Sequence, residues 1–396
     1  METLNGAAVL KARPNWREKV KVEWEYKTEI FETRDGTEQR RAMRAKPRRR
    51  VEFQNAIFGA AGRGFRMSMA HGAHALSVIE DVIECRYINS PSGTQATVLS
   101  VSGMPYWAVA GGGIVVTTGG NQQFRTIALA SGSSITVDSA VLVADGTTVA
   151  PVVIGRIDEG QSYKRLTAGV GQTSLAFVEE PTEMPNPINR DTDPDSVYHG
   201  FPVARFRPNW ANETNENFRH RFDSLDYGYG KTFTYLIEPQ ARWEGSMTCI
   251  GRDKDEVDRA QAFFHRRKGR LGAFYMPTWQ EDMSIISGAT PASETIVVEG
   301  TDAHDLFNGS MLYRNLAFVT PEDFVPVGIE DVIISGGNTH ITLDSPLPVA
   351  AADTAYISWL MMVRFASDQF AVTWTTNEVA EFDFSVVSLL VPPDTN

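Results

Sequence analysis

The tetrapeptide Arg13-Pro14-Asn15-Trp16 occurs twice in this chain, the second time as Arg207-Pro208-Asn209-Trp210. A second echo follows in each half, where Ser134-Ile135-Thr136-Val137-Asp138-Ser139 resembles His340-Ile341-Thr342-Leu343-Asp344-Ser345. The echoes come in the same order and with similar spacing. The pattern predicts an internal duplication, in which one fold is used twice around a common axis.

Shorter matches between the two repeats support the duplication. Trp16 to Pro47 parallels Trp210 to Pro239, and Arg50-Val51-Glu52 parallels Arg242-Trp243-Glu244. Two further pairs follow in the same order, namely Ser131-Gly132 with Ser335-Gly336, and Gly155-Arg156-Ile157 with Val363-Arg364-Phe365. Because all of these pairs are colinear, they indicate a common origin better than any one of them does alone.

Length and composition describe a folded protein of more than one domain. A chain of 396 residues is too long for one ordinary core, and 42% of its residues are hydrophobic. The net charge of −12 does not favour nucleic-acid binding by the molecule as a whole. Cys85 and Cys249 are too few for a disulfide framework, so we expect reduced thiols, as in a cytoplasm. We expect neither a transmembrane helix nor a secretory signal.

A proline-rich segment divides the chain. Pro181, Pro185, Pro187 and Pro194 alternate with acidic residues, which predicts an extended linker over residues 179–199. The first copy then occupies residues 1–178 and the second residues 200–396. Each copy contains a long glycine-punctuated stretch, about 85–157 and 285–363, that we interpret as a small β insertion carried on the main fold.

Most of the remaining segments have the alternation that is typical of half-buried strands. Thr232 to Ile237, Arg242 to Ile250 and Phe382 to Val386 alternate apolar and polar residues and are rich in aromatic or β-branched side chains. Strands of this kind build sandwiches or barrels. The sequence therefore predicts a mainly β protein with two β-sandwich domains.

One helix is predicted in the second copy, starting after Asp253, which can cap it. Acidic residues crowd its first turn, basic residues fill its last turn, and Gly269 can adopt the left-handed conformation that ends it. Val257, Ala260 and Phe264 lie on one face. The first copy has a weaker, glycine-broken counterpart near Ala56 to Ala75, so each domain is expected to carry a flanking helix.

The chain offers no catalytic, metal or cofactor signature. Gly62-Arg63-Gly64 lacks the lysine spacing of a phosphate-binding loop and indicates a turn. His71 and His74 are three residues apart, but no zinc pattern surrounds them. No G-x-S-x-G elbow is present. We expect no enzyme activity, no metal and no cofactor.

The sharpest charge feature is the basic run between Gln39 and Arg50. Such a run can contact phosphate, form a solvated face, or pair with carboxylates of a neighbouring subunit. We favour the last interpretation, because the chain carries excess acid elsewhere and no aromatic residue interrupts the run. The candidate inter-subunit interface consists of Arg40, Arg41, Arg44, Arg48, Arg49 and Arg50.

Several segments of the chain resemble a known family. Phe31-Glu32-Thr33, the run Gly36 to Arg40 and Pro47-Arg48-Arg49 are similar to an early stretch of the distal tail, or tail-tip, proteins of siphophages and gene-transfer agents. Gly269 to Trp279 and Val363 to Asp368 in the second copy resemble later stretches of the same proteins.

The resemblance implies a non-enzymatic structural protein of a bacteriophage virion, a minor tail or baseplate protein assembled in the cytoplasm of the host bacterium. Such proteins use the tail-tube fold, a β-sandwich flanked by a helix, in rings that join the tail tube protein to the baseplate hub and fibre proteins. DNA passes through the lumen without specific binding, and no membrane is contacted. The acidic balance suits such a conduit.

The same resemblance sets an expectation for symmetry. Tail tubes are six-fold, whereas hubs and fibres are usually three-fold. A chain with two tube-like domains is therefore expected to form a trimeric ring with pseudo-six-fold symmetry, with a hexamer as the alternative, through head-to-tail contacts.

A second reading is host attachment. In this alternative the protein is a tail-associated module that binds host glycan, and Tyr106 and Trp107, beside a triple glycine, stack against sugars. The same two aromatic residues are also suited to a core.

Overall fold

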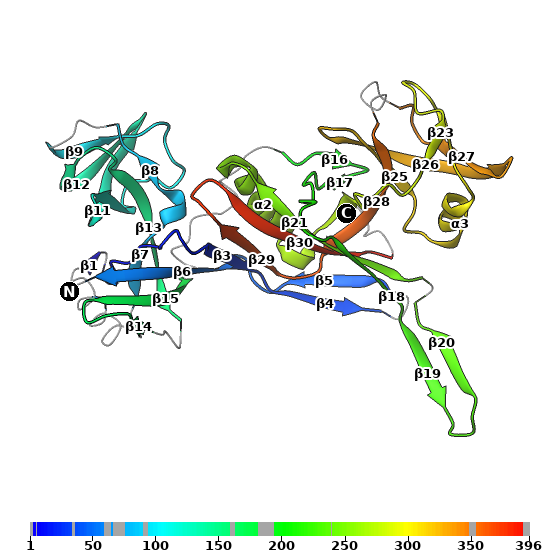
Figure 1. Cartoon of the computed structure of the whole chain (residues 1–396), viewed down its shortest axis with the longest axis horizontal. Helices are drawn as coiled ribbons and strands as arrows, with labels where there is room; N and C mark the ends of the chain where they lie inside the picture. The colour runs from blue at the N-terminus through cyan, green and yellow to red at the C-terminus, as the bar shows by residue number, and fades with distance from the viewer. Residues whose placement is uncertain are drawn as a thin grey trace.

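The computed structural model describes residues 3–4, 6–33, 36–58, 65, 76–89, 94–158, 163–180, 194–238, 240–347 and 354–390. Strands dominate these residues and α-helices are few, so the prediction of a mainly β protein is confirmed. Figure 1 shows the chain as an elongated body with its N-terminus at one end.

Within its described residues, the first half of the chain supplies ten strands to the body and five strands with one short helix to an insertion. The body strands are β1 (Thr3–Leu4), β2 (Ala7–Val9), β3 (Val20–Glu25), β4 (Thr28–Glu32), β5 (Glu38–Ala42), β6 (Arg48–Phe58), β7 (Ser77–Glu80), β13 (Thr148–Ile157), β14 (Tyr163–Arg165) and β15 (Val170–Glu179). The insertion holds η1 (Val82–Glu84), β8 (Arg86–Tyr87), β9 (Thr94–Ser100), β10 (Gly113–Thr118), β11 (Asn121–Ser131) and β12 (Ser134–Val143).

The second half has a similar division. Its body contains β16 (Val197–Tyr198), β17 (Phe201–Pro202), β18 (Asn215–Arg219), β19 (Phe222–Asp226), β20 (Thr232–Leu236), β21 (Arg242–Gly251), α2 (Lys254–Arg267), η3 (Gly269–Leu271), β22 (Ala273–Pro277), β28 (Tyr356–Phe365), β29 (Gln369–Trp374) and β30 (Ala380–Ser388). Its insertion contains β23 (Ile285–Ser287), β24 (Thr295–Val298), α3 (Asp302–Gly309), β25 (Asn315–Val319), β26 (Phe324–Ser335) and β27 (Asn338–Leu343).

A single antiparallel row of strands crosses both halves. Its order is β14-β15-β6-β3-β29-β30-β21-β18, in which β3 of the first half pairs directly with β29 of the second. In Figure 1 this row runs from β14 and β15 at one end of the molecule to β18 at the other. The two halves therefore continue one another edge to edge.

The two halves use the same pairing order. In the first half β3 pairs with β6, β6 with β15, β15 with β13 and β13 with β7, while β14 pairs with β15. In the second half β18 pairs with β21, β21 with β30, β30 with β28 and β28 with β22, while β29 pairs with β30.

The register agrees as well as the order. Lys21 lies opposite Glu52 in the first half, and Asn215 lies opposite Ser246 in the second. Each residue of the second pair comes 194 positions after its counterpart in the first. The same offset separates Arg207 from Arg13. The hairpins obey the same offset, with Thr28 opposite Ala42 in β4–β5 and Phe222 opposite Leu236 in β19–β20. The structural counterpart of Arg242 is thus Arg48, and the match with Arg50 made from sequence is wrong by two residues.

The repeated tetrapeptide has the same local structure in both places. The backbone N–H of Asn15 donates to Gln54 at 2.6 Å, and that of Asn209 to Thr248 at 2.7 Å. In each copy the Asn side chain accepts a hydrogen bond from the backbone N–H two residues later. Asparagine is favoured at such turns for this reason. The motif recurs because it fixes the turn before β3 and before β18.

The helix predicted in the second copy is confirmed as α2. The Asp253 side chain accepts from the Glu256 N–H at 2.7 Å, which caps the helix. The left-handed ending begins at Lys268, with φ of 52°, one residue before the predicted Gly269, which has φ of 66°. The counterpart near Ala56 to Ala75 falls almost entirely outside the described residues.

The cap gives a simple test of helix stability. Asp253→Ala is expected to lower the free energy of unfolding by about 1 kcal/mol, because the Glu256 N–H loses its acceptor. The nearby exposed Asp255→Ala removes only a favourable interaction with the helix dipole and is the control. Chemical denaturation followed by circular dichroism measures both, and an equal loss in the two variants would contradict the capping role.

One buried core extends through both halves. Trp24, Phe177, Phe370 and Phe384 belong to a single contiguous cluster and are almost fully buried. The halves are therefore joined by a shared sheet and core, rather than only by the linker predicted over residues 179–199. Most of that linker, 181–193, lies outside the described residues.

The insertions continue out of long body strands. In β13, residues Thr148 to Pro151 pair with β10 of the insertion, and Val152 to Gly155 pair with β7 of the body. The change therefore falls within β13, before the predicted end at 157. Likewise β28 pairs with β25 at its start and with β22 and β30 further on. The first insertion has its own core, which contains Trp107.

Within the described ranges, neither α-helix has the length and apolar character that crossing a membrane requires.

Candidate functional site: the joint between the two halves

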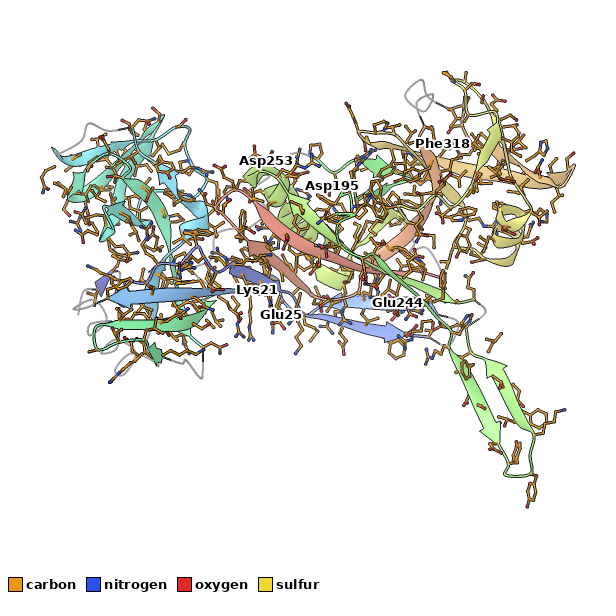
Figure 2. The ribbon with its side chains drawn as sticks, viewed as in Figure 1. Lys21, Glu25, Asp195, Glu244, Asp253 and Phe318 are labelled. Carbon is orange, nitrogen blue, oxygen red and sulfur yellow. The ribbon has the colours of Figure 1, made fainter. Side chains whose placement is uncertain are left out.

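The joint is centred on the pairing of β3 with β29. Six residue pairs join them, among them Lys21 opposite Thr373 and Val22 opposite Val372. Along β3 every second side chain is buried and the others reach the opposite, polar face of the sheet. Lys21 and Glu25 lie on this polar face (Figure 2).

On the apolar face, helix α2 of the second half contacts the first half. The ring of Trp24 meets His265 edge-on, with ring centroids 4.8 Å apart. The Tyr26 hydroxyl lies 3.2 Å from Nδ1 of the same histidine, and burial raises the pKa of Tyr26. Lys254 Nζ donates to Glu84 at 2.9 Å. Trp24, Tyr26 and Glu84 come from the first half, so these contacts hold the two halves at a fixed angle.

On the polar face, the β4–β5 hairpin of the first half lies against the second half (Figure 1). Its Glu38 carboxylate accepts from Arg242 Nη1 at 2.9 Å and from Arg364 Nε at 2.7 Å. Arg242 also bonds to Glu32 of the hairpin and to Glu238. The Glu38 side chain is 4% exposed and that of Arg242 is 7% exposed. Buried charges of this kind are tolerated only when they are paired.

Two further contacts hold the ends of the β4–β5 hairpin against the second half. At its base, the Thr28 N–H and hydroxyl donate to the two Asp368 carboxylate oxygens at 2.7 and 2.8 Å. At its turn, Gly36 has φ of 85°, and a Cβ there would lie 2.6 Å from Leu390. Glycine is needed at this position both for the backbone angle and for the close approach.

The charge cluster is expected to make the stability of the joint depend on pH. Burial acts to raise the pKa of Glu38, but the hydrogen bonds and charges of Arg364 and Arg242 outweigh it and lower the pKa below the ordinary value of 4.5. A carboxyl group with a lowered pKa in the folded state stabilises the protein fully when the pH is above the pKa of the unfolded state. This stabilisation is lost as the pH falls through the pKa of the folded state. The wild type is therefore expected to lose more unfolding free energy than Glu38→Gln when pH falls below about 4.5.

Urea denaturation at a series of pH values tests this expectation. Because Glu38→Gln cannot titrate at this position, its unfolding free energy falls less steeply with acid than that of the wild type. Parallel curves for the two proteins would show that Glu38 does not carry the pH dependence.

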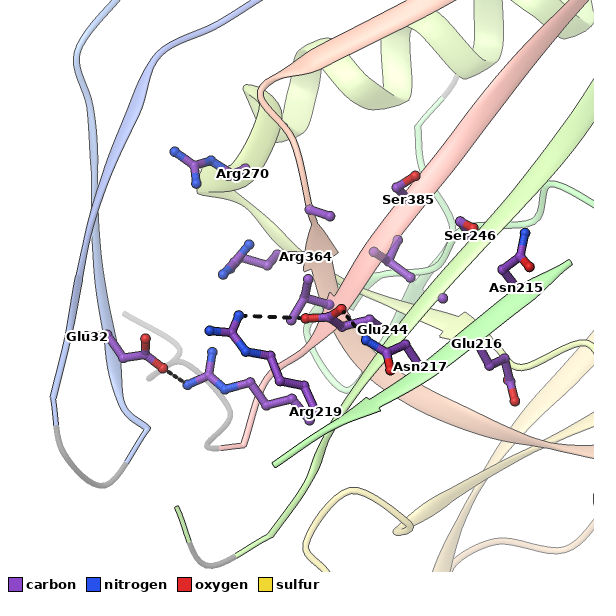
Figure 3. A pocket seen from close by; sticks show the side chains of 15 residues that line it. Glu32, Asn215, Glu216, Asn217, Arg219, Glu244, Ser246, Arg270, Arg364 and Ser385 are labelled. Carbon is purple, nitrogen blue, oxygen red and sulfur yellow. Dashed lines mark hydrogen bonds and ion pairs between the residues drawn. The ribbon is translucent and has the colours of Figure 1, made fainter. Parts of the chain in front are cut away.

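A hollow of about 440 Å³ lies beside the hairpin, on the polar face. Figure 3 shows Glu32 on one side and Arg364, Arg270 and the β18–β21 strands on the other. The Glu244 carboxylate in its wall pairs with Arg219 at 3.8 Å and accepts from Asn217 at 3.1 Å. Ser246 and Ser385 also line the hollow, but no histidine is among its described lining residues. The arrangement suits contact with another surface better than catalysis.

The second half repeats the hairpin and the edge strand, but leaves them uncovered. Every residue of β18, β19 and β20 is exposed, and the β19–β20 hairpin projects away from the body (Figure 1). The half-buried strand predicted from alternation is thus wrong for Thr232 to Leu236. Gly230, at the position of Gly36, has φ of 88° and nothing within 4 Å of an added Cβ.

The first half has the complementary free surface. Among the described strands, β14, the counterpart of β29, pairs only with β15. Arg48 and Arg156 occupy the positions of Arg242 and Arg364 and are exposed, whereas Arg242 and Arg364 are buried beneath the β4–β5 hairpin. One joint is therefore formed within the chain, and both sides of a second joint stand open.

The six arginines of the predicted interface lie in different environments in the structure. Arg48 and Arg41 are exposed, Arg44 pairs with Glu25 at 3.0 Å, and Arg50 pairs with Glu52 and Asp158. Arg49 is buried and pairs with Asp81 at 2.8 Å and Glu179 at 3.3 Å, so it serves the core of its own half.

Arg40 belongs to the internal joint. Its side chain is largely buried and lies 3.9 Å from Glu38 of the same hairpin. Burial lowers the pKa of Arg40. The negative charge of Glu38 acts to raise this pKa, and the positive charge of Arg364 acts to lower it. The sequence did not single out Glu32, Glu38, Arg242 or Arg364 as interface residues, although all four lie within matched stretches of the repeats.

No group of three or more potential metal ligands occurs among the residues that the structure describes. Gly62-Arg63-Gly64, His71 and His74 lie outside those residues.

In comparisons with known proteins, no protein-family model and no curated protein matches this chain.

Proposed function

We propose that this chain is a non-enzymatic structural protein of a phage tail tip, which forms part of a ring around a channel through which DNA passes. The observation that carries the proposal is the internal joint. Each of its two sides has an unused counterpart, and these counterparts lie at the opposite ends of the strand row, at β14 and β18. A chain built in this way suits head-to-tail closure into a ring.

The proposal includes the internal duplication. Each half is a tail-tube-like β-sandwich with a flanking helix and a small β insertion, and the two descend from one ancestral domain. The constant offset of 194 positions from the repeated tetrapeptide through β18–β21 supports this origin, because unrelated domains do not share strand order, register and sequence motif together.

The favoured assembly is a trimer with pseudo-six-fold symmetry. Each chain contributes two similar bodies and one finished joint, so three chains supply six bodies. Head-to-tail contacts that do not close would give an open filament. A hexamer of chains is the alternative and requires a smaller rotation between successive bodies.

The polar face of the shared sheet is proposed to line the channel. Several of its cations are paired with carboxylates of the same face, as in Lys21 with Glu23 at 2.9 Å, Arg50 with Glu52 at 2.7 Å and Arg219 with Glu244. Paired cations release few counterions from DNA, and the net charge of −12 opposes binding. DNA can then pass without being held.

The neighbours in this proposal are the tail tube protein on one side and the baseplate hub and fibre proteins on the other. The virion is the place of function, and the two insertions are the candidate docking surfaces because each projects from the body (Figure 1). The alternative of glycan binding has less support, since Trp107 is only 6% exposed and offers no open face for a sugar.

The oligomeric state tests the proposal. Native mass spectrometry and light scattering over a range of concentrations are expected to give a closed species of three chains. Six chains would exclude the trimer but retain the ring. A protein that remains monomeric at all concentrations would oppose the proposed function.

A further inference from the structure

The uncovered elements at the two ends of the strand row, β14 and β18–β20, define a specific contact with a second copy. Resting on the proposed function, we infer that the β18–β20 segment of one chain packs against the first half of a second copy. The register is the one in which β3–β5 packs against the second half of its own chain. The occupant is argued from the internal joint, which already shows how this type of edge and hairpin is covered.

The edge pairing follows from the counterpart positions. Lys21 corresponds to Asn215, because they lie opposite Glu52 and Ser246. Thr373 corresponds to Lys164, because they lie opposite Glu381 and Gln172 in the matching pairs of β30 and β15. Since Lys21 lies opposite Thr373, the inferred joint places Asn215 opposite Lys164 of the partner subunit.

The same reasoning places the hairpin. Glu32, which bonds to Arg242, corresponds to Asp226, and Arg242 corresponds to Arg48. Asp226 of one chain is therefore inferred to pair with Arg48 of the partner subunit. Both side chains are on exposed residues of the isolated chain, which leaves them available.

Apolar exposure supports a protein partner for this segment. An isolated two-stranded hairpin is marginally stable, yet the β18–β20 segment displays several large side chains, on both faces of its hairpin. Exposed apolar side chains mark interaction surfaces, and aromatic residues dominate their energetics. Two of them hold positions that the internal joint covers, since Phe218 corresponds to the buried Trp24 and Phe222 to the buried Thr28. The exposed residues are Phe218 (52%), Phe222 (58%), Tyr227 (64%), Tyr229 (96%), Phe233 (45%) and Tyr235 (52%).

One position differs between the two joints. Glu38, which bridges both buried arginines, corresponds to Thr232, so the inferred joint lacks that carboxylate. Arg156, the counterpart of Arg364, then gains no matching acid from the hairpin. The contact between chains is therefore inferred to be weaker than the joint within the chain.

A cysteine crosslink tests the edge register. In a Cys85→Ser background, full-length protein carrying Asn215→Cys and Lys164→Cys is oxidised and run on a non-reducing gel. Directly opposite residues on antiparallel strands have Cα atoms about 4.5–5.5 Å apart, within the range of a disulfide. A species of two and then three chains is expected, ending at the size of the closed ring.

Two matched variants make the result specific. Lys21→Cys with Thr373→Cys places the pair at the internal joint, so it is expected to crosslink within one chain and leave the mass unchanged. Asn217→Cys with Lys164→Cys moves one partner by two residues, to about 7–8 Å from its target, and is expected to crosslink several-fold less.

A charge exchange tests the hairpin. Asp226→Arg and Arg48→Asp are each expected to weaken assembly at least tenfold, and the double variant is expected to recover most of the loss because the ion pair is restored in reverse. Circular dichroism confirms folding. Equal assembly of the single variants and the wild type would overturn the hairpin contact.

The outcomes separate this inference from the proposed function. Assembly without the Asn215–Lys164 crosslink, or with equal crosslinking of the displaced pair, rejects the inferred register but leaves the ring. Absence of both assembly and crosslink rejects the two together. Capture of a different tail protein by β18–β20, while the chain alone stays monomeric, also rejects a second copy as the occupant.

Discussion

Glu38→Ala is expected to lower the free energy of unfolding by about 3–5 kcal/mol, the cost typical of removing one partner from a buried ion pair. Arg364 loses both of its bonds to this carboxylate, at 2.7 and 2.9 Å, and keeps the bond of its side chain to the neighbouring Phe365 carbonyl. Arg242 loses a partner at 2.9 Å but retains Glu32 and Glu238. Chemical denaturation measures the loss.

The chain contains a matched control for this variant. Thr232 holds the position of Glu38 in the uncovered hairpin and is exposed. Thr232→Ala is therefore expected to change the stability of the single chain by less than about 0.5 kcal/mol. If the two variants were equally destabilised, the hairpin contact of the first half would not be the source of the effect.

Trp24→Ala is expected to destabilise the protein by about 3–5 kcal/mol, as large-to-small changes of buried aromatic residues do. Its ring is 1% exposed, packs edge-on to His265 and lies beneath the Arg49 guanidinium, 5.1 Å from the ring centroid. The substitution therefore opens a cavity between the halves and removes a cation–π contact.

Phe218 is the counterpart of Trp24 on β18 and is half exposed. Phe218→Ala should leave the stability of the dilute chain nearly unchanged but weaken its assembly, because this side chain is covered only when a second copy binds. A large loss of stability in the monomer would show that Phe218 already belongs to a core, against the account of the open edge.

Local features were predictable from the sequence where neighbouring residues determine them. The α2 helix begins and ends on its own capping residues, and the recurrence of Asn15 as Asn209 reflects a turn hydrogen bond made within a few residues. Alternation also located β21 and β30 correctly, because their buried residues belong to the common core.

Burial of the hairpins was not predictable from alternation. Thr232 to Leu236 has the same pattern as a half-buried strand, yet β20 is exposed on both faces. The body of the second half covers one face of β4–β5, which contains Thr28 and Glu38, and nothing within the described chain occupies the corresponding place beside β19–β20. Exposure here depends on a neighbour and not on the strand itself.

The six arginines of the predicted interface do not share one surface, for a geometric reason. Successive side chains of a strand point to opposite faces, so Arg48 is exposed while Arg49 is buried against Asp81 and Glu179. The residues that do form the joint, Glu38, Arg242 and Arg364, are far apart in sequence and meet only through the pairing of β3 with β29.

A cryo-electron microscopy reconstruction of the assembled protein tests the central claim most directly, since it shows whether one joint is used both within and between chains. The account predicts three chains and six similar bodies in a closed ring, with β18 beside β14 of the next chain and the β19–β20 hairpin over Arg48 of the partner subunit. A two-fold dimer, or a ring in which β18 and β14 remain apart, would contradict it.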